Sequence, residues 1–337
     1  MTAGTSARIV TFGEAMVRLT PPGHERLERA DRLDITVGGA ELNTAATIAC
    51  LEVPVTWVST LPRTPLGRLI ARGARAAGVG TSAIRWVAET EGRAGVYLLE
   101  EGTDPRPSAV HYDRAGSAFA RLPAGAFDWP VLLEGASGLH ISGITPALGE
   151  GPRAETEASM RAAKAAGVTV GFDLNYRSKL WSEEEARRCF AELAPLADVL
   201  FTSRSGLRTF FGIDGDHAET LRLARERLGI GTIILSRKRS KASRSVRLGS
   251  VAIGGDGEVV EGTWRAVEVV DLLGGGDAFA GGFLAGYVAD PSDLPRALAL
   301  GGSAQALKHT MPGDFLTATR EEIEAAVDAA DGGVLQR

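Results

Sequence analysis

The stretch VEVVDLLGGGDAFAGGFLAGYV, residues Val267–Val288, places three consecutive glycines and an aspartate between a strand-like run and an apolar helical run. Val267–Val270 is rich in the β-branched residues of a strand, and the residues from Asp277 onward have the Ala, Phe and Leu content of a buried helix. Glycines at such a turn let the backbone approach a ligand closely. The first N–H groups of a helix are unpaired and lie at the positive end of its dipole. The sequence therefore predicts an anion site at Gly274–Gly276, suited to a phosphate group.

The carboxylate of Asp277 is unexpected there, because a carboxylate repels a phosphate. It is explained if a hydroxyl group must lose its proton while it attacks that phosphate. Asp277 is then predicted to be the general base, and the N–H groups of Gly274, Gly275 and Gly276 stabilise the charge on the transferred phosphoryl group. The alternative is a helix start with an acidic first turn and closely packed glycines. This alternative would be preferred for a single glycine. The run GGGD followed by AFAGGF favours the functional interpretation.

Two common nucleotide-binding motifs are missing from the chain. No GxxxxGK[ST] occurs, and GGGDAF does not complete GxGxxG because Phe279 stands where the third glycine would be. The glycine run also lies near the C-terminus, whereas a dinucleotide fingerprint opens its domain. The sequence thus argues against a P-loop enzyme and against a dehydrogenase.

Composition excludes several classes of partner. The chain has 337 residues, of which 44% are hydrophobic and 23% charged, and its formal net charge is -5. That charge gives no basic field for nucleic acid or an anionic membrane, and no window approaches the roughly 18 apolar residues of a membrane span. The two cysteines, Cys50 and Cys189, are expected to be free thiols in a reducing cytosol. A cytoplasmic protein without nucleic-acid or membrane partners is predicted.

Short β-branched runs alternate with Ala-, Leu- and Arg-rich helical segments along most of the chain. Several of these runs are apolar nearly throughout, as strands covered on both faces must be. The pattern predicts an α/β fold with a doubly wound, mostly parallel sheet. The candidate strands are Arg8–Gly13, Val55–Leu61, a run from Gly138, Val168–Asn175, Ala197–Ser203 and Gly231–Arg237.

Two regions, at about residues 16–38 and 89–117, break this rhythm. Both alternate apolar and polar residues with period two and contain turn residues, so they are predicted to be hairpins with one open face. Such insertions would form a small sheet projecting from the main one. Surface hairpins without a role are the alternative on pattern alone.

Familiar motifs occur at both ends of the chain. DLLGGGDAFAGGFLAG resembles the C-terminal signature of the ribokinase-like (PfkB) sugar kinases, and VGGAELNTA (Val37–Ala45) resembles their N-terminal Gly-Gly motif. The resemblance covers essentially the whole chain. It implies one ribokinase-like domain, residues 1–337, with the two hairpin regions as its β-sheet lid. It also implies ATP and Mg²⁺ as cofactors, an anion hole made by the glycine run, Asp277 as the catalytic base and a homodimer paired through lid strands.

Several words are most similar to those of 2-keto-3-deoxygluconate kinases, namely GEAMVRLTPPG, GGAELN, HYDRAGSAF, FDLNYRSKLW and LKHTMPGDF. That group phosphorylates the terminal hydroxyl of a keto-acid sugar. The residues support a sugar acid independently, because a carboxylate site needs a planar, permanently charged donor. Arg114 and Arg177 follow expected strands, where ligand-binding loops emerge. The alternative for both arginines is an ordinary surface ion pair.

The resemblance implies two further sets of site residues. The substrate residues would be Gly38, Gly39, Asn43, Tyr97, Tyr112, Arg114, Asn175, Arg177 and Asp314. The nucleotide would contact Ser236, Arg237, Gly274, Gly276 and His309. The two tyrosines could instead be ordinary strand aromatics. The metal ligands stay unassigned, because the histidines show no metal-ligand spacing.

Two departures from the family pattern bear on activity. Ribokinase-like enzymes commonly carry an N-x-x-E motif, and here Ser203 and Gly206 stand in place of the Asn and the Glu. Leu235–Gly249 is unusually basic; Arg237 is expected to contact ATP phosphates and the other basic residues to be solvated. The expected reaction converts 2-keto-3-deoxygluconate into 2-keto-3-deoxy-6-phosphogluconate. The alternatives are a kinase for a neutral sugar, of fructokinase or ribokinase type, and a catalytically degenerate sugar-binding protein of the same fold.

Overall fold

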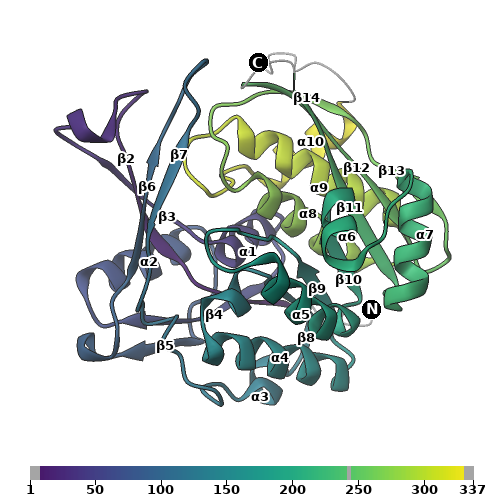
Figure 1. The fold of residues 1–337 in the computed structure, drawn as a ribbon, viewed down its shortest axis with the longest axis horizontal. Helices are drawn as coiled ribbons and strands as arrows, with labels where there is room; N and C mark the ends of the chain where they lie inside the picture. The colour runs from purple at the N-terminus through teal and green to yellow at the C-terminus, as the bar shows by residue number, and fades with distance from the viewer. Residues whose placement is uncertain (1–7, 241–243, 330–337) are drawn as a thin grey trace.

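The computed structural model describes residues 8–240 and 244–329, and its main sheet has ten strands. The order is β13-β12-β11-β10-β9-β8-β1-β4-β5, with β14 also paired to β12 (Figure 1). The parallel strands are β1 (Arg8–Phe12), β4 (Val55–Pro62), β5 (Ile84–Val87), β8 (Ala136–Ser142), β9 (Thr169–Asp173), β10 (Val199–Thr202) and β11 (Thr232–Ser240). The antiparallel strands are β12 (Ser245–Ile253), β13 (Val259–Glu261) and β14 (Arg265–Glu268).

Helices cover both faces of this sheet, so that alternate residues of one strand enter different cores. In β10, Leu200 packs with α4 (Glu150–Ala165), α5 (Glu183–Leu193) and α6 (Arg204–Phe211), whereas Phe201 packs with α1 (Ala40–Cys50) and α8 (Gly275–Ala289). Burial on both faces is the reason for the nearly continuous apolar runs in the sequence. The predicted doubly wound, mostly parallel α/β fold is confirmed. The remaining helices are α2 (Pro65–Ala76), α3 (Trp129–Leu133), α7 (His217–Leu228), α9 (Leu294–His309) and α10 (Arg320–Asp328).

The two irregular regions form a separate four-stranded sheet, called the lid sheet below, in the order β3-β2-β6-β7. Two antiparallel hairpins make it up, joined by parallel pairing of β2 with β6. In Figure 1 it extends to one side of the main body. The predicted small sheet is therefore present, while its role as a lid and as a dimer contact stays a prediction. Its strands are β2 (Met16–Thr20), β3 (Asp34–Gly38), β6 (Gly95–Glu100) and β7 (Ala109–Asp113).

The helix begins at the glycines, as predicted, because α8 starts at Gly275. Gly274 caps the helix with φ 79°, a left-handed conformation that favours glycine. A Cβ atom at Gly274 would also lie 2.0 Å from the backbone oxygen of Asp314. The glycine run is thus the first turn of the helix together with its cap, pressed against the loop that carries Asp314.

Cys50 and Cys189 are free thiols, as predicted, and burial raises the pKa of each. Within residues 8–240 and 244–329, no helix is long and apolar enough to cross a bilayer. The predicted basic loop forms the ends of β11 and β12. Its tip, residues 241–243, lies outside the described residues.

Candidate active site

Residues from the lid strands and from the starts of α1 and α8 surround one pocket, called the lid pocket below. This is the edge where parallel strands end and where α/β proteins bind ligands. The structure brings most of the predicted substrate and catalytic residues together there. The predicted residues that line it are Gly39, Asn43, Tyr97, Tyr112, Arg114, Arg177, Gly274, Asp277 and Asp314.

Two predicted substrate residues do not line the lid pocket. Gly38 lies behind it, where a Cβ atom would be 2.3 Å from the Tyr97 hydroxyl and 2.5 Å from Oδ2 of Asp314. Its missing side chain leaves room for the hydrogen bond that Tyr97 donates to Asp314, at 2.7 Å. Asn175 lines the neighbouring cleft, and its backbone N–H donates to Asp173.

Asp277 is held by the first strand–helix turn of the chain. Asn43 Nδ2 donates to Asp277 Oδ2 at 2.7 Å, and Asn43 Oδ1 accepts from the backbone N–H of Gly39 at 3.2 Å. Burial raises the pKa of Asp277 to about 6, although the Asn43 hydrogen bond and the charge of Arg177 oppose the shift. A carboxylate with that pKa is ionised at neutral pH and more basic than an ordinary aspartate, as a general base must be.

The amides beside Asp277 belong to the first turn of α8, so the helix leaves them without carbonyl partners. Gly275 packs against His309, where a Cβ atom would lie 2.2 Å from Nε2 of the imidazole. Gly276 has open space on its outer side and lines the two clefts next to the lid pocket. The turn therefore presents backbone N–H groups and the positive helix end to whatever anion occupies these clefts.

All four of the predicted nucleotide residues outside the lid pocket gather in one cleft, called the outer cleft below. Ser236, Arg237, Gly276 and His309 line it, together with Gln305, which the sequence did not indicate. Gly274, the fifth predicted nucleotide residue, lies one turn away in the lid pocket. The Arg237 guanidinium lies 4.8 Å from the centre of the Trp264 ring, which fixes its orientation.

His309 is held at the edge of the outer cleft by the loop before the glycine run. Its Nδ1 lies 2.9 Å from the backbone oxygen of Asp271. Burial lowers the pKa of the His309 imidazole, so the ring is neutral at physiological pH. A neutral ring suits a contact with an uncharged heterocycle better than a charge contact with phosphate.

Glu14, which the sequence analysis missed, changes the interpretation of Arg114. Arg114 Nε donates to Glu14 Oε2 at 2.8 Å, Nη2 bonds the same oxygen, and Ser117 Oγ donates to Glu14 Oε1. Glu14 is buried and lines the lid pocket. Arg177, in contrast, is exposed, and its side chain makes no hydrogen bond or ion pair with any residue the structure describes. Of the two predicted carboxylate-binding arginines, only Arg177 has no acid in hydrogen-bond or ion-pair contact among the described residues, although its charge acts on Asp173 and Asp277.

Two further acids near Asp277 were also missed. Glu41 is buried beside the lid pocket, and its Oε1 accepts from Ser142 N, Ser142 Oγ and Thr145 Oγ1 at 2.8–2.9 Å. Burial raises the pKa of Glu41 to about 7. Asp173 ends β9, and burial followed by the charge of Asp277 raises its pKa to about 7. An acid directly after an apolar strand, as in FDLN, was the available signal for Asp173.

A magnesium ion fits the residues on one side of this site. Asp173 and Gly276 line the same cleft. Among the described residues there is no group of three His, Cys, Asp or Glu side chains placed to hold a metal. Mg²⁺ is usually held by one or two carboxylates with phosphates and waters, so the Asp173 carboxylate is the type of ligand that such a site requires. At the N-x-x-E position, Ser203 Oγ accepts from Gly206 N–H as a helix cap, and no acid is present.

Known proteins resemble this chain over most of its length. The model of the pfkB family of carbohydrate kinases matches residues 6–315. A 2-dehydro-3-deoxygalactonokinase of Haloferax volcanii is 39% identical over 98% of this chain and 99% of its own. A 2-dehydro-3-deoxygluconokinase of Bacillus subtilis is 28% identical over 95% of each chain. The crystal structure of a Thermotoga maritima 2-dehydro-3-deoxygluconokinase superposes with a TM-score of 0.91 at 34% identity, covering 96% of this chain and 98% of that one.

Proposed function

Because the chain belongs to the pfkB family of carbohydrate kinases, we propose that it transfers the terminal phosphoryl group of ATP to a 2-keto-3-deoxy sugar acid. The acceptor is the terminal hydroxyl, so 2-keto-3-deoxygluconate would give 2-keto-3-deoxy-6-phosphogluconate. The observation that carries the proposal is the arrangement around Asp277. A basic carboxylate faces the lid pocket, and the N–H groups of the glycine turn lie beside it. Arg177, whose side chain has no ion-pair partner among the described residues, lines the same pocket.

The proposed chemistry follows from these positions. The sugar occupies the lid pocket with its terminal hydroxyl at Asp277, which accepts the proton as the oxygen attacks phosphorus. The amides of Gly275 and Gly276 and the end of α8 stabilise the negative charge on the transferred group. Asn43 keeps the Asp277 carboxylate in one orientation throughout. Positioning and preorganised dipoles then supply most of the rate acceleration.

The nucleotide is proposed to lie in the outer cleft, with its phosphates directed toward Gly276 and its base near His309. Arg237 and Lys238 line the cleft, and Arg237 also pairs with the exposed Glu261 at 3.1 Å. Mg²⁺, held by Asp173, would neutralise phosphate charge when bound. The missing acid at Gly206 leaves Asp173 as the proposed protein contact of the metal.

The sugar carboxylate is proposed to bind Arg177, because Glu14 already balances the charge of Arg114. Arg114 and Glu14 then form a fixed donor and acceptor pair for sugar hydroxyls. The relatives act on the galacto and the gluco epimer according to their names, and they share the keto-deoxy acid. The acid is thus the better supported part of the substrate, and the epimer is open to test.

Replacing Arg177 by Ala should raise KM for the sugar acid about ten- to a hundredfold, the loss expected for one charged hydrogen-bonded contact. KM values for neutral sugars should not change, because they carry no carboxylate to lose. Steady-state kinetics on 2-keto-3-deoxygluconate and on fructose measures both effects. Arg161→Ala, which removes an exposed arginine paired with Glu157 on α4, is the matched control. An equal loss on both sugars would exclude Arg177 as the carboxylate contact.

The rate should depend on pH through Asp277, whose pKa is raised to about 6. The base acts only when ionised, so kcat/KM for the sugar at saturating ATP should be level above that pKa and fall as pH drops through it. Asn43 lowers the pKa of Asp277, and Asn43→Leu should therefore move the acidic limb to higher pH. Titration of ATP itself cannot produce such a shift between variants. An acidic limb that Asn43→Leu leaves in place would contradict the assignment.

One substrate panel tests the function as a whole. ADP release is followed with both epimers of the keto-deoxy acid, fructose and ribose, and thermal stabilisation is recorded with each sugar. The proposal expects turnover that is fastest on a sugar acid. Preference for a neutral sugar would support the fructokinase or ribokinase type, and stabilisation without turnover would support a degenerate binding protein.

A further inference from the structure

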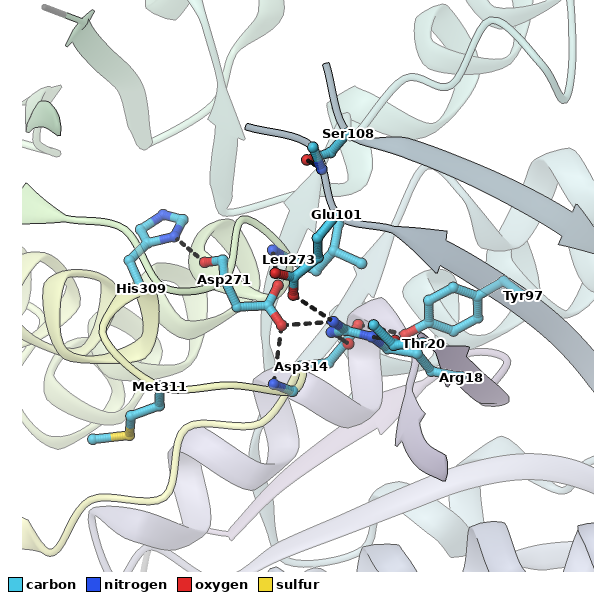
Figure 2. Close-up of polar contacts among 12 residues, drawn as sticks. Arg18, Thr20, Tyr97, Glu101, Ser108, Asp271, Leu273, His309, Met311 and Asp314 are labelled. Atoms are coloured by element: carbon cyan, nitrogen blue, oxygen red, sulfur yellow. Dashed lines mark hydrogen bonds and ion pairs between the residues drawn. The ribbon is translucent and has the colours of Figure 1, made fainter. Parts of the chain in front are cut away.

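One arginine of the lid sheet is buried between two loops behind the site. Arg18, on β2, has a side chain only 3% exposed. Its Nη1 donates to Asp314 Oδ1 at 2.7 Å, and its Nη2 lies 2.7 Å from Asp271 Oδ2. Figure 2 shows the guanidinium between these two acids, with Glu101 of the lid hairpin on a third side. The planar fork of an arginine can serve two carboxylates at once, which a lysine ammonium on its flexible stem does far less well.

The first of these acids belongs to the sugar side of the site. Asp314 lines the lid pocket, and its second oxygen accepts the hydrogen bond from Tyr97 on β6. Two lid strands therefore converge on Asp314, through Arg18 from β2 and through Tyr97 from β6. Any shift of the lid sheet over the sugar moves one or both of these bonds.

The second acid belongs to the phosphoryl side. Asp271 Oδ1 accepts from the N–H of Leu273, and Oδ2 accepts from the N–H of Gly313, both at 3.0 Å. Leu273 immediately precedes the helix cap Gly274, so Asp271 fixes the turn that orients the glycine amides. The backbone oxygen of Asp271 is also in hydrogen-bond contact with Nδ1 of His309, which lines the outer cleft (Figure 2).

The charges make Arg18 necessary rather than incidental. Asp271 and Asp314 are both buried; burial raises the pKa of Asp314, repulsion by Asp271 adds to that rise, and the charge of Arg18 opposes it. Lys308 also lies among these groups, but its ammonium donates to the backbone oxygen of Met311. Without the guanidinium of Arg18, neither acid has an ion-pair partner among the described residues, and the two loops lose the contact that they share.

Resting on the proposed function, we infer that Arg18 is a positioning residue that couples the two halves of the reaction. Its contact with Asp314 links it to the sugar side of the site, where the lid sheet lies. Its contact with Asp271 holds the turn whose amides are proposed to bind the phosphoryl group. Sugar binding should therefore favour the arrangement that binds ATP, and ATP binding should favour the arrangement that binds sugar. Arg18 touches neither ligand in this scheme.

Binding measurements on the full chain test the coupling. The Kd of β,γ-methylene ATP is measured by calorimetry with and without saturating 2-keto-3-deoxygluconate. The wild type should bind the analogue at least about fivefold more tightly in the presence of the sugar acid. Arg18→Lys keeps the charge but loses the fork. Its ratio should therefore fall toward one while each ligand still binds alone, and its kcat should fall more than its KM values change.

Arg93→Lys is the matched control, because Arg93 is an exposed arginine next to the lid that pairs with Asp113 and contacts neither loop. A merely structural role for Arg18 would lower Tm and leave the coupling ratio intact. An Arg18→Lys ratio equal to that of the wild type, or no coupling in the wild type, would overturn the inference. If Arg18→Lys does not fold, Asp271→Asn gives the same comparison, since it keeps an acceptor for Leu273.

The proposed function fails separately from this inference. A wild type that turns over no sugar acid in the panel would refute the substrate assignment. The coupling ratio is then measured with the panel sugar that stabilises the protein most, and the same two outcomes decide the role of Arg18.

Discussion

Asp277→Asn should lower kcat by about a hundred- to ten-thousandfold, the range that general bases contribute. Asparagine has the same shape and can still accept the hydrogen bond from Asn43, so the geometry of the pocket is preserved. It cannot accept the proton of the attacking hydroxyl. Binding of an ATP analogue should be nearly unchanged, because the glycine amides and the outer cleft are intact. Single-turnover kinetics and calorimetry measure the two quantities.

Thermal stability of the Asp277→Asn variant distinguishes a loss of catalysis from misfolding. Burial raises the pKa of Asp277, which means that the folded protein disfavours the charged carboxylate it carries at neutral pH. The neutral amide side chain of the Asp277→Asn variant removes that cost, so Tm at neutral pH should not fall. Asp293→Asn, at the cap of α9, is a control in which the cap bond survives and kcat stays the same. Turnover by Asp277→Asn close to that of the control would refute the role of the base.

Much of the fold follows from the sequence because strand burial determines composition locally. The strands covered on both faces required apolar residues at nearly every position, and the lid sheet required alternation. The exact first residue of α8 was not predictable within the glycine run, because glycine is disfavoured inside helices and gives no local signal for one position over the next. Packing of Gly275 against His309, and of Gly274 against Asp314, places these residues at the helix end, and both contacts come from far along the chain.

The candidate site was only partly predictable for a similar reason. Motif residues such as Asn43 and Asp277 are close neighbours in space although 234 positions separate them, and only the family resemblance joined them. Glu14 and Arg18 lack any local signal of their partners. Glu14 meets Arg114 and Arg18 meets Asp314 through the packing of the lid sheet on the main body. Charge balance between distant segments is visible only in three dimensions, and it is the reason for proposing Arg177 rather than Arg114 as the carboxylate contact.

The turn at Gly274 should tolerate no side chain. Its φ of 79° costs an L-residue roughly 1–2 kcal/mol. A Cβ atom would also lie 2.0 Å from the backbone oxygen of Asp314 and 3.1 Å from Cε of the buried Lys308. The oxygen cannot move alone, because Asp314 is held by Arg18 and Tyr97. The glycine turn must therefore shift, and the amides of the proposed anion hole move with it.

We expect Gly274→Ala to lower kcat about a hundredfold or more, since a displacement of about 1 Å at reacting groups has that effect. Gly229→Ala is the matched control, because Gly229 caps α7 with φ 67° and a Cβ atom there meets open space. Both variants suffer the backbone strain and should lose some thermal stability, but only Gly274→Ala moves the anion hole. The ratio of their kcat values, measured at equal folded fractions, therefore separates the effect of displaced amides from the effect of backbone strain. A ratio near one would mean that the turn does not bind the transferred phosphoryl group, and the proposed mechanism would lose its basis.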